Sequence, residues 1–288
     1  MKSRTKLTKI LTGVLLTIAV GLFCMQAAYL LFHTRFEVEY TDLRLFYVIN
    51  IIIVVCLTVS LFLVFRMSKI WKIILPVLAV GLMTFQIVMM MNQNDRVHHV
   101  VSLSPDLKQM LVLKEDVETG QSTYYRTRYG LFARPQENLP YETKGDFKVK
   151  WLEDDVAAVT YQAADGTLHQ YIGTYGYRDS GISYSYVSSS LSGKWRGENV
   201  QVTTTPEGII VEDAGKPQLY PYDDIVQFGT LAIVLTNQDE AEWTIALNEN
   251  FASHSNDPDP PEGEITLYEA SMEENEPVTL EYAESPEF

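Results

Sequence analysis

The chain has 288 residues, a formal net charge of -15 and two cysteines. A surface this acidic argues against nucleic acid and against anionic lipid as partners, because both repel negative charge. Both cysteines, Cys24 and Cys56, fall in apolar stretches, so the remainder of the chain has no disulfide and must fold on its hydrophobic core.

Three apolar stretches dominate the N-terminal part of the chain: residues 10–32, 45–65 and 70–91. A helix of about 20 apolar residues crosses the hydrocarbon core of a bilayer. The stretches contain no acidic or basic residue except Lys72, near the start of the third. We therefore predict a three-helix transmembrane bundle over residues 1–92. A cleaved signal peptide is the alternative for the first stretch, but its apolar run is too long.

Basic residues flank these stretches unevenly. The segment before the first stretch, and the link from the second into the third, carry no acid and seven basic residues: Lys2, Arg4, Lys6, Lys9, Arg66, Lys69 and Lys72. The link between the first and second stretches carries Glu37, Glu39 and Asp42 with two arginines. Basic flanks stay in the cytoplasm. We predict a multi-pass protein of the cell membrane, with a cytoplasmic N-terminus and an extracytoplasmic C-terminal region.

One amide side chain lies in each apolar stretch, at a similar depth from the outer end: Gln26, Asn50 and Gln86. An amide that faces lipid without a partner loses its hydrogen bonds. We expect the three side chains to bond to one another as an intramembrane polar layer. A transport path is the alternative, and it is less favoured because no ionisable residue lies at that depth.

After residue 92 the apolar residues alternate with a period of two and turn residues recur, which predicts short antiparallel strands. We expect strands at 97–103, 110–113, 122–129, 147–152, 156–162 and 168–174, and a long loop at 134–144. This pattern predicts an all-β extracytoplasmic region, either a sandwich or a partial barrel. The first β domain is expected over residues 93–190.

Further short strands are expected at 195–202, 208–212, 225–228, 231–236 and 242–247. They predict a second β domain over residues 191–252. The tail, residues 253–288, is rich in proline and has no Lys or Arg. We expect the tail to be largely disordered, with short strands only at 265–268 and 278–282. The spacing of its acids does not match a calcium-binding loop.

Catalytic motifs are missing from the sequence of the outer region: it has no nucleophile elbow, no zinc-protease motif and no phosphate-binding glycine loop. We therefore expect no catalytic residue and no cofactor. His33, His98 and His99 fall near the outer membrane boundary. No cysteine joins them, and the adjacent pair points in different directions, so we predict no metal site.

Aromatic and basic residues are adjacent at Tyr124, Tyr125, Arg126 and Arg128. Guanidinium groups beside aromatic rings suit an anionic ligand, and these four are the candidate ligand-binding residues. The alternative is an exposed strand face whose arginines balance nearby acids.

The outer region contains the segments Ser104-Pro-Asp, His169-Gln-Tyr, Gln227-Phe-Gly-Thr and Trp243-Thr-Ile-Ala-Leu. With these segments it resembles membrane proteins of Gram-positive bacteria that have no assigned activity. Those proteins have three N-terminal transmembrane helices and an extracytoplasmic β-rich domain. The resemblance implies the same layout here and no activity.

Together these observations predict an interaction or scaffold protein of the cell envelope rather than an enzyme. Its expected partners are the lipid bilayer and an envelope or membrane protein, with the oligomeric state left open. A sensor for an extracellular ligand is the alternative, and it would need a pocket lined by Tyr and Arg. An envelope hydrolase would need a buried acid pair, such as Asp154 or Asp155 with another carboxylate.

Overall fold

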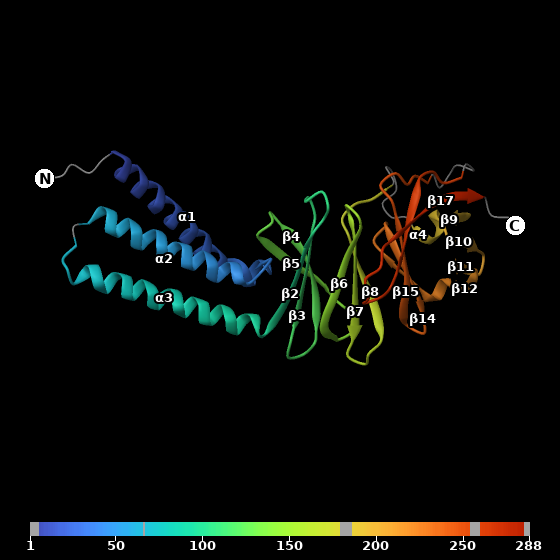
Figure 1. Ribbon diagram of the computed structural model, residues 1–288, viewed down its shortest axis with the longest axis horizontal. Coiled ribbons are helices and arrows are strands. Elements are labelled where there is room, and N and C mark those ends of the chain that lie inside the picture. Colours follow the sequence, from blue (N-terminus) through green and yellow to red (C-terminus); the bar gives the residue numbers. More distant parts are fainter. Residues whose placement is uncertain (1–5, 66, 179–185, 254–259, 285–288) are drawn as a thin grey trace. The chain divides into compact units, whose positions relative to one another are not determined.

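The computed structural model describes residues 6–65, 67–178, 186–253 and 260–284 (Figure 1). It begins with three long helices: α1 (Lys6–Phe36), α2 (Arg44–Val64) and α3 (Trp71–Asn94). Each is long and apolar enough to cross a membrane. The helices are followed by β structure, so the predicted fold class of three apolar helices and an all-β region is confirmed.

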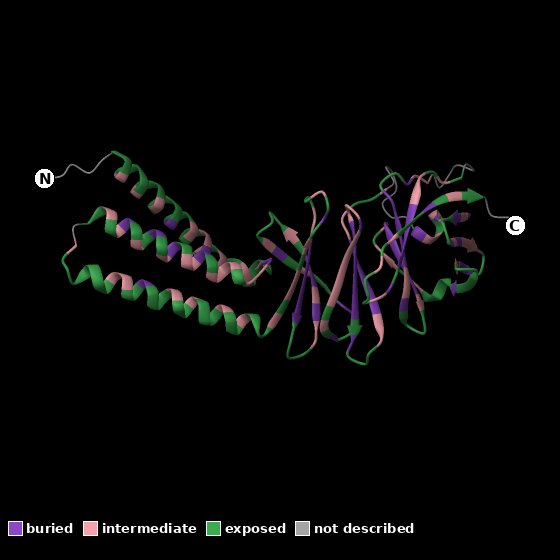
Figure 2. Ribbon diagram, in the orientation of Figure 1, coloured by how far each residue is buried: buried purple, intermediate pink, exposed green. Residues whose placement is uncertain are grey.

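Helix α2 packs against both α1 and α3. Its buried residues Ile49, Ile53, Cys56 and Ser60 recur every three or four positions, which places them on one helical stripe. In the most apolar part of each helix, 22% of α2 is buried, against 11% of α1 and 6% of α3. Most of the helical surface is therefore exposed apolar side chain, as a lipid-facing bundle requires (Figure 2).

A five-stranded sheet follows the helices along the chain. Its spatial order is β1-β5-β4-β3-β2. The strands are β1 (Glu39–Tyr40), β2 (Val97–Leu103), β3 (Met110–Asp116), β4 (Ser122–Arg128) and β5 (Phe132–Asn138). Strand β1 comes from the link between α1 and α2, and it pairs antiparallel with β5. A segment of only two residues thus joins the membrane helices to the sheet.

The C-terminal part contains two further sheets. The three-stranded sheet, in the order β6-β7-β8, consists of β6 (Thr143–Glu153), β7 (Val156–Ala163) and β8 (Leu168–Thr174). The nine-stranded sheet has the order β12-β11-β10-β9-β17-β16-β15-β14-β13 and curves into a nearly closed barrel. Its strands are β9 (Lys194–Arg196), β10 (Val200–Thr205), β11 (Gly208–Asp213), β12 (Lys216–Pro221), β13 (Ile225–Phe228), β14 (Ala232–Asn237), β15 (Glu240–Leu247), β16 (Glu264–Glu269) and β17 (Val278–Glu284). This part of the chain also contains two short helices, α4 (Val187–Ser190) before β9 and η1 (Tyr222–Asp224) between β12 and β13.

Strands β14, β15 and β16 are buried on both faces, which explains their nearly continuous apolar sequences. One face contributes Ile233, Ile245 and Leu267 to the barrel core around Trp195. The other face contributes Val234, Ala246 and Tyr268 to a second core, which also contains Val156, Ala158 and Ile172 of the three-stranded sheet. The three-stranded sheet therefore packs on the outside of the barrel.

The chain forms two compact units, and their limits differ from the expected domain boundaries. The first unit comprises residues 1–101, 112–119 and 123–138, so it holds the helices and most of the five-stranded sheet. The second comprises residues 102–111, 120–122 and 139–288. The expected domain over 93–190 is thus divided, because β1 ties the first sheet to the helices and the second core ties β6–β8 to the barrel.

Two other expectations need correction. The tail is not largely disordered over residues 264–284, because β16 pairs with β15 and β17 pairs with β9 in the middle of the nine-stranded sheet. The segment 134–144 is not one long loop either, since β5 runs to Asn138. The sequence of β5 lacks apolar alternation because most of its side chains are polar, and its pairing with β1 is a long-range interaction. Residues 254–259 of the tail lie outside the described residues.

Candidate functional site

The link between α1 and α2, residues 37–43, is called the junction loop here. It is attached to the sheet and to the helices at once. Tyr40 is fully buried and lies opposite Phe132 of β5. Its hydroxyl donates to Oε1 of Gln26 in α1 at 3.0 Å, and Nε2 of Gln26 donates to the carbonyl of Phe46 in α2 at 2.9 Å. A buried hydrogen-bonded path therefore runs from Tyr40 of the junction loop, through the Gln26 side chain of α1, to α2.

Lys114 of β3 extends this path into the sheet. Its ammonium group donates to Oε2 of Glu39 at 2.6 Å and to the carbonyl of Tyr40 at 2.8 Å, and it lies 4.3 Å from the ring centroid of Tyr125. The Lys114 side chain is only 5% exposed. A buried ammonium needs both a counter-charge and hydrogen-bond acceptors, and the junction loop supplies them.

Burial dominates the electrostatics of this cluster. It lowers the pKa of Lys114, although the Glu39 carboxylate opposes the shift. It raises the pKa of Tyr125, and the negative charge of Glu39 and a hydrogen bond with that carboxylate raise it further. We call Gln26, Glu39, Tyr40, Lys114 and Tyr125 the junction cluster. Its donors and acceptors pair with one another, which suits a structural clamp.

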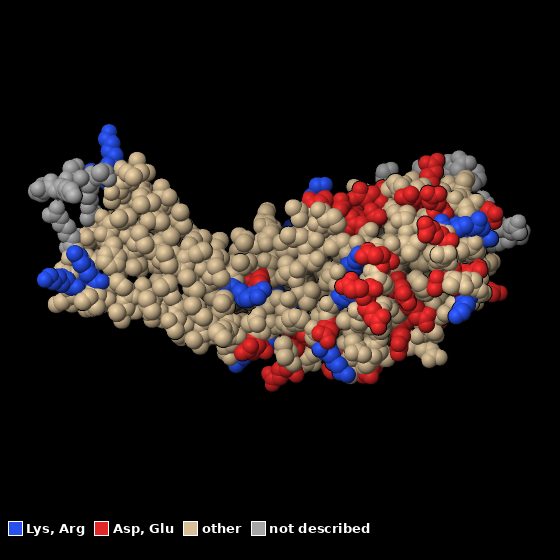
Figure 3. All heavy atoms as spheres, in the orientation of Figure 1, with Lys and Arg blue, Asp and Glu red and all other residues tan. Residues whose placement is uncertain are grey.

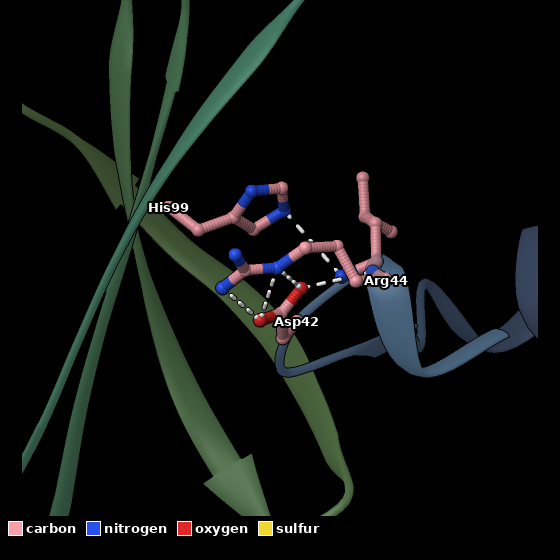
Figure 4. Close-up of polar contacts among 4 residues, drawn as sticks. Asp42, Arg44 and His99 are labelled. Atoms are coloured by element: carbon pink, nitrogen blue, oxygen red, sulfur yellow. Dashed lines mark hydrogen bonds and ion pairs between the residues drawn. The ribbon is translucent and has the colours of Figure 1, made fainter. Parts of the chain in front are cut away.

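A second set of contacts closes the junction loop at its C-terminal end (Figure 4). Asp42 accepts hydrogen bonds from the backbone N–H of Arg44 at 2.9 Å and from its guanidinium group at 2.5–2.9 Å. His99 of β2 reaches the loop, and its Nε2 accepts from the backbone N–H of Leu43 at 3.4 Å. These contacts position the first turn of α2 against β2.

The two titratable groups of this set shift in the same direction. Burial lowers the pKa of His99, with a smaller opposing effect from the charge of Asp42. Burial alone would raise the pKa of Asp42, but the hydrogen bonds and the charge of Arg44 outweigh it and leave that pKa lowered. The folded protein therefore favours a neutral His99 beside an ionised Asp42.

The four candidate ligand-binding residues do not form one site. Tyr125 points into the junction cluster, and Tyr124 is also buried. Arg126 and Arg128 are exposed on β4. A β-bulge between Tyr124 and Tyr125 interrupts the alternation that the sequence implied.

The predicted amide layer also differs from the structure. Gln26 is buried, as expected, but its partners are Tyr40 and Phe46. Within the described part of the chain, no hydrogen bond joins Gln26 to Asn50 or Gln86. The reason is that the junction loop brings the Tyr40 hydroxyl to Gln26 within α1, which satisfies the amide without a third helix.

The histidines near the membrane boundary have separate partners. His33 contacts the Tyr29 carbonyl, His98 lies 3.3 Å from a Glu115 carboxylate oxygen, and His99 contacts Leu43. Among the described residues, no group of three or more His, Cys, Asp or Glu is arranged to hold a metal ion. Of the two acids named for a hydrolase, Asp155 binds the guanidinium group of Arg178 at 2.5 and 2.7 Å.

Sequence reasoning missed Glu39, Tyr40 and Lys114. The sequence offered one local signal: the short link between the first two apolar stretches contains acidic residues and an aromatic residue, Tyr40. Comparison with known proteins found no matching family model, no matching curated protein and no matching solved structure.

The contact between Gln26 and Tyr40 predicts energetic coupling. Gln26→Leu and Tyr40→Phe should each destabilise the protein in detergent, because each leaves a buried polar atom unpaired. The double variant should lose less than the sum of the two, by about 0.5–1.5 kcal/mol. Denaturant unfolding of all four proteins measures this. The control cycle pairs Tyr40→Phe with Gln86→Leu, which should be additive; an additive Gln26 cycle would show that the contact does not form.

The environment of His99 predicts a pH dependence of stability. Because the folded pKa lies below the unfolded one, the unfolded chain binds a proton that the folded chain does not, and stability falls as pH drops from 7 towards 5. Asp42 contributes in the same direction only at lower pH, below its ordinary value of 3.8. His99→Gln keeps an acceptor for Leu43 and should reduce the slope in this window. Burial also lowers the pKa of His169, so this histidine should account for part of the pH dependence that remains in the variant. Unchanged slopes in thermal unfolding would contradict this role of His99.

Proposed function

We propose that this protein is a membrane-anchored interaction protein that presents its five-stranded sheet, β1–β5, to a protein partner at one face of the membrane. This sheet is called the platform below. The observation that carries the proposal is the position of β2 at the edge of the five-stranded sheet. This strand is the last in the five-stranded sheet, and Val101 on it is 43% exposed. An uncovered strand edge with exposed apolar side chains is a template for strand addition by a partner chain.

The attachment of the platform supports the same proposal. Only Asp95 and Arg96 separate α3 from β2, and the junction cluster ties α1 and α2 to β3 and β5. Two independent connections restrict how the sheet can move on the bundle. A scaffold benefits from such a fixed presentation, whereas a simple tether would need a single flexible linker.

The orientation of the platform is part of the proposal. Lys6, Lys9, Lys69 and Lys72 lie at the ends of the helices away from the junction loop, and Figure 3 shows basic side chains at that end of the bundle. The positive-inside rule places this end in the cytoplasm and the sheet outside. The resemblance to Gram-positive membrane proteins supports a cell-membrane location.

A sensor for a small ligand is the second candidate function, and one pocket favours it. The pocket has a volume of about 270 Å³ and is lined by residues that include Tyr141, Tyr161, His169, Tyr171 and Phe228. The rings of Tyr141 and His169 stack at 3.7 Å, and the buried Tyr161 hydroxyl has no hydrogen-bond partner in the described chain. The pocket has the expected tyrosines but no arginine. It is small for a ligand site.

The orientation can be tested with single cysteines in a Cys24→Ala, Cys56→Ala background. A cysteine in place of Glu274, which is exposed, should react with a membrane-impermeant maleimide on intact cells whose wall is permeable. A cysteine in place of Ser3 should react only after the membrane is broken. Labelling in the reverse order would place the platform in the cytoplasm and overturn the extracytoplasmic part of the proposal.

The role of the β2 edge predicts the effect of a charge on Val101. Val101→Lys should abolish cross-linking and co-purification of a stoichiometric partner in mild detergent, because a lysine on an edge strand blocks strand addition. Its unfolding midpoint should stay close to that of the unaltered protein, since the side chain is exposed. Leu219→Lys, at an exposed position on β12, is the matched control. A partner that binds both variants equally would rule out this edge.

A further inference from the structure

The turn between β4 and β5 exposes an aromatic residue in an uncommon backbone conformation. Tyr129 is 96% exposed, with φ of 55°, and Gly130 follows with φ of 70°. A bulky side chain rarely adopts this left-handed region, and persistent strain of this kind is a reason to look for a role. Leu131, next in the turn, is 43% exposed. The tip of the hairpin thus exposes an amphipathic side chain, Tyr129, and an apolar one, Leu131.

Backbone contacts place this tip beside the ends of α1 and α2. The N–H of Thr41 donates to the carbonyl of Leu131 at 3.0 Å, and its hydroxyl lies 3.4 Å from the carbonyl of Gly130. Phe132, the first residue of β5, has its ring 6.3 Å from that of Tyr29. Tyr29 belongs to the apolar stretch of α1, so β5 begins at the boundary of the hydrocarbon region. Tyrosine is enriched at this level of membrane proteins.

Three arginines lie on the same hairpin. Arg126 on β4 is directly opposite Arg134 on β5, and Arg128 is two residues further along β4, so all three project from one face. All three are exposed. None of their guanidinium groups has a salt bridge or hydrogen bond to another described residue. Like charges placed opposite each other repel, and an anion between them would remove that repulsion.

We propose that the β4–β5 hairpin is a lipid-binding element. Tyr129 and Leu131 enter the interface of the leaflet next to the sheet, and Arg126, Arg128 and Arg134 bind the phosphate groups of anionic phospholipids there. Guanidinium groups bind phosphate by paired hydrogen bonds, and basic residues near a membrane attract anionic headgroups. The acidic net charge suggested no affinity for anionic lipid. The net charge is an average over the chain, however, and Arg126, Arg128 and Arg134 form a local basic cluster. This inference does not depend on the protein partner proposed above.

The test uses the full chain in mild detergent, titrated with short-chain phosphatidylglycerol and followed by native mass spectrometry. The triple variant Arg126→Gln, Arg128→Gln, Arg134→Gln should bind this lipid about 100-fold more weakly, since each basic residue at a membrane surface contributes about fivefold. The control variant Lys144→Gln, Arg196→Gln, Lys216→Gln has the same net charge and removes three exposed basic residues of the second unit. It should retain binding. Equal losses in the two variants would overturn the proposal.

Three further measurements test insertion of the tip, binding of free anions and the folding of the variant. A fluorescent label on a cysteine in place of Tyr129, with Cys24 and Cys56 replaced by alanine, should be quenched by spin-labelled lipids in nanodiscs. An unquenched label would place the tip in water and overturn the insertion. Millimolar inorganic phosphate should not displace phosphatidylglycerol; displacement would indicate a site for free anions instead. Replacing the three arginines with lysines should preserve much of the binding, which separates loss of charge from loss of folding.

Discussion

The buried ammonium group of Lys114 is the interaction on which the membrane-proximal structure depends. Removing a charge from water costs several kcal/mol, so Lys114 is tolerated only where a carboxylate and a carbonyl meet it. Glu39 and the Tyr40 carbonyl do so, and both belong to a loop of seven residues between two helices. If the loop left the sheet, the charge would be buried without compensation. The junction loop and β3 must therefore stay together.

This constraint makes the helices and the first sheet one structural unit. Tyr40 joins the junction loop to α1 by its hydrogen bond to Gln26, and β1 joins the loop to β5 by backbone pairing. The same pairing brings the turn at Tyr129 against the junction loop, where Thr41 contacts the carbonyls of Gly130 and Leu131. A short strand thus determines the position of the β2 edge and of the arginines on the hairpin. The partner-binding edge and the lipid-binding element that we propose both follow from it.

The candidate site was only partly predictable. Tyr125, Arg126 and Arg128 were identified as a group because they lie close together in sequence. In the structure, side chains alternate between the two faces of β4, so Tyr125 lies in the junction cluster and the arginines lie on the surface. Arg134 joins them through strand pairing, which sequence proximity does not reveal. Gln26 was correctly identified as a buried polar group, but its partner lies on a loop rather than in a neighbouring helix.

The sequence alone determined the three helices and the β character of the rest, because length, hydropathy and a period of two are local properties. It also indicated strands at 265–268 and 278–282 inside a segment whose composition suggested disorder. The tertiary structure alone decided that β17 lies between β9 and β16, that β1 exists, and that the compact units cut across the expected domains. Those features depend on hydrogen bonds and packing between residues far apart in the chain. Such long-range pairings leave no periodic signal in either partner's sequence.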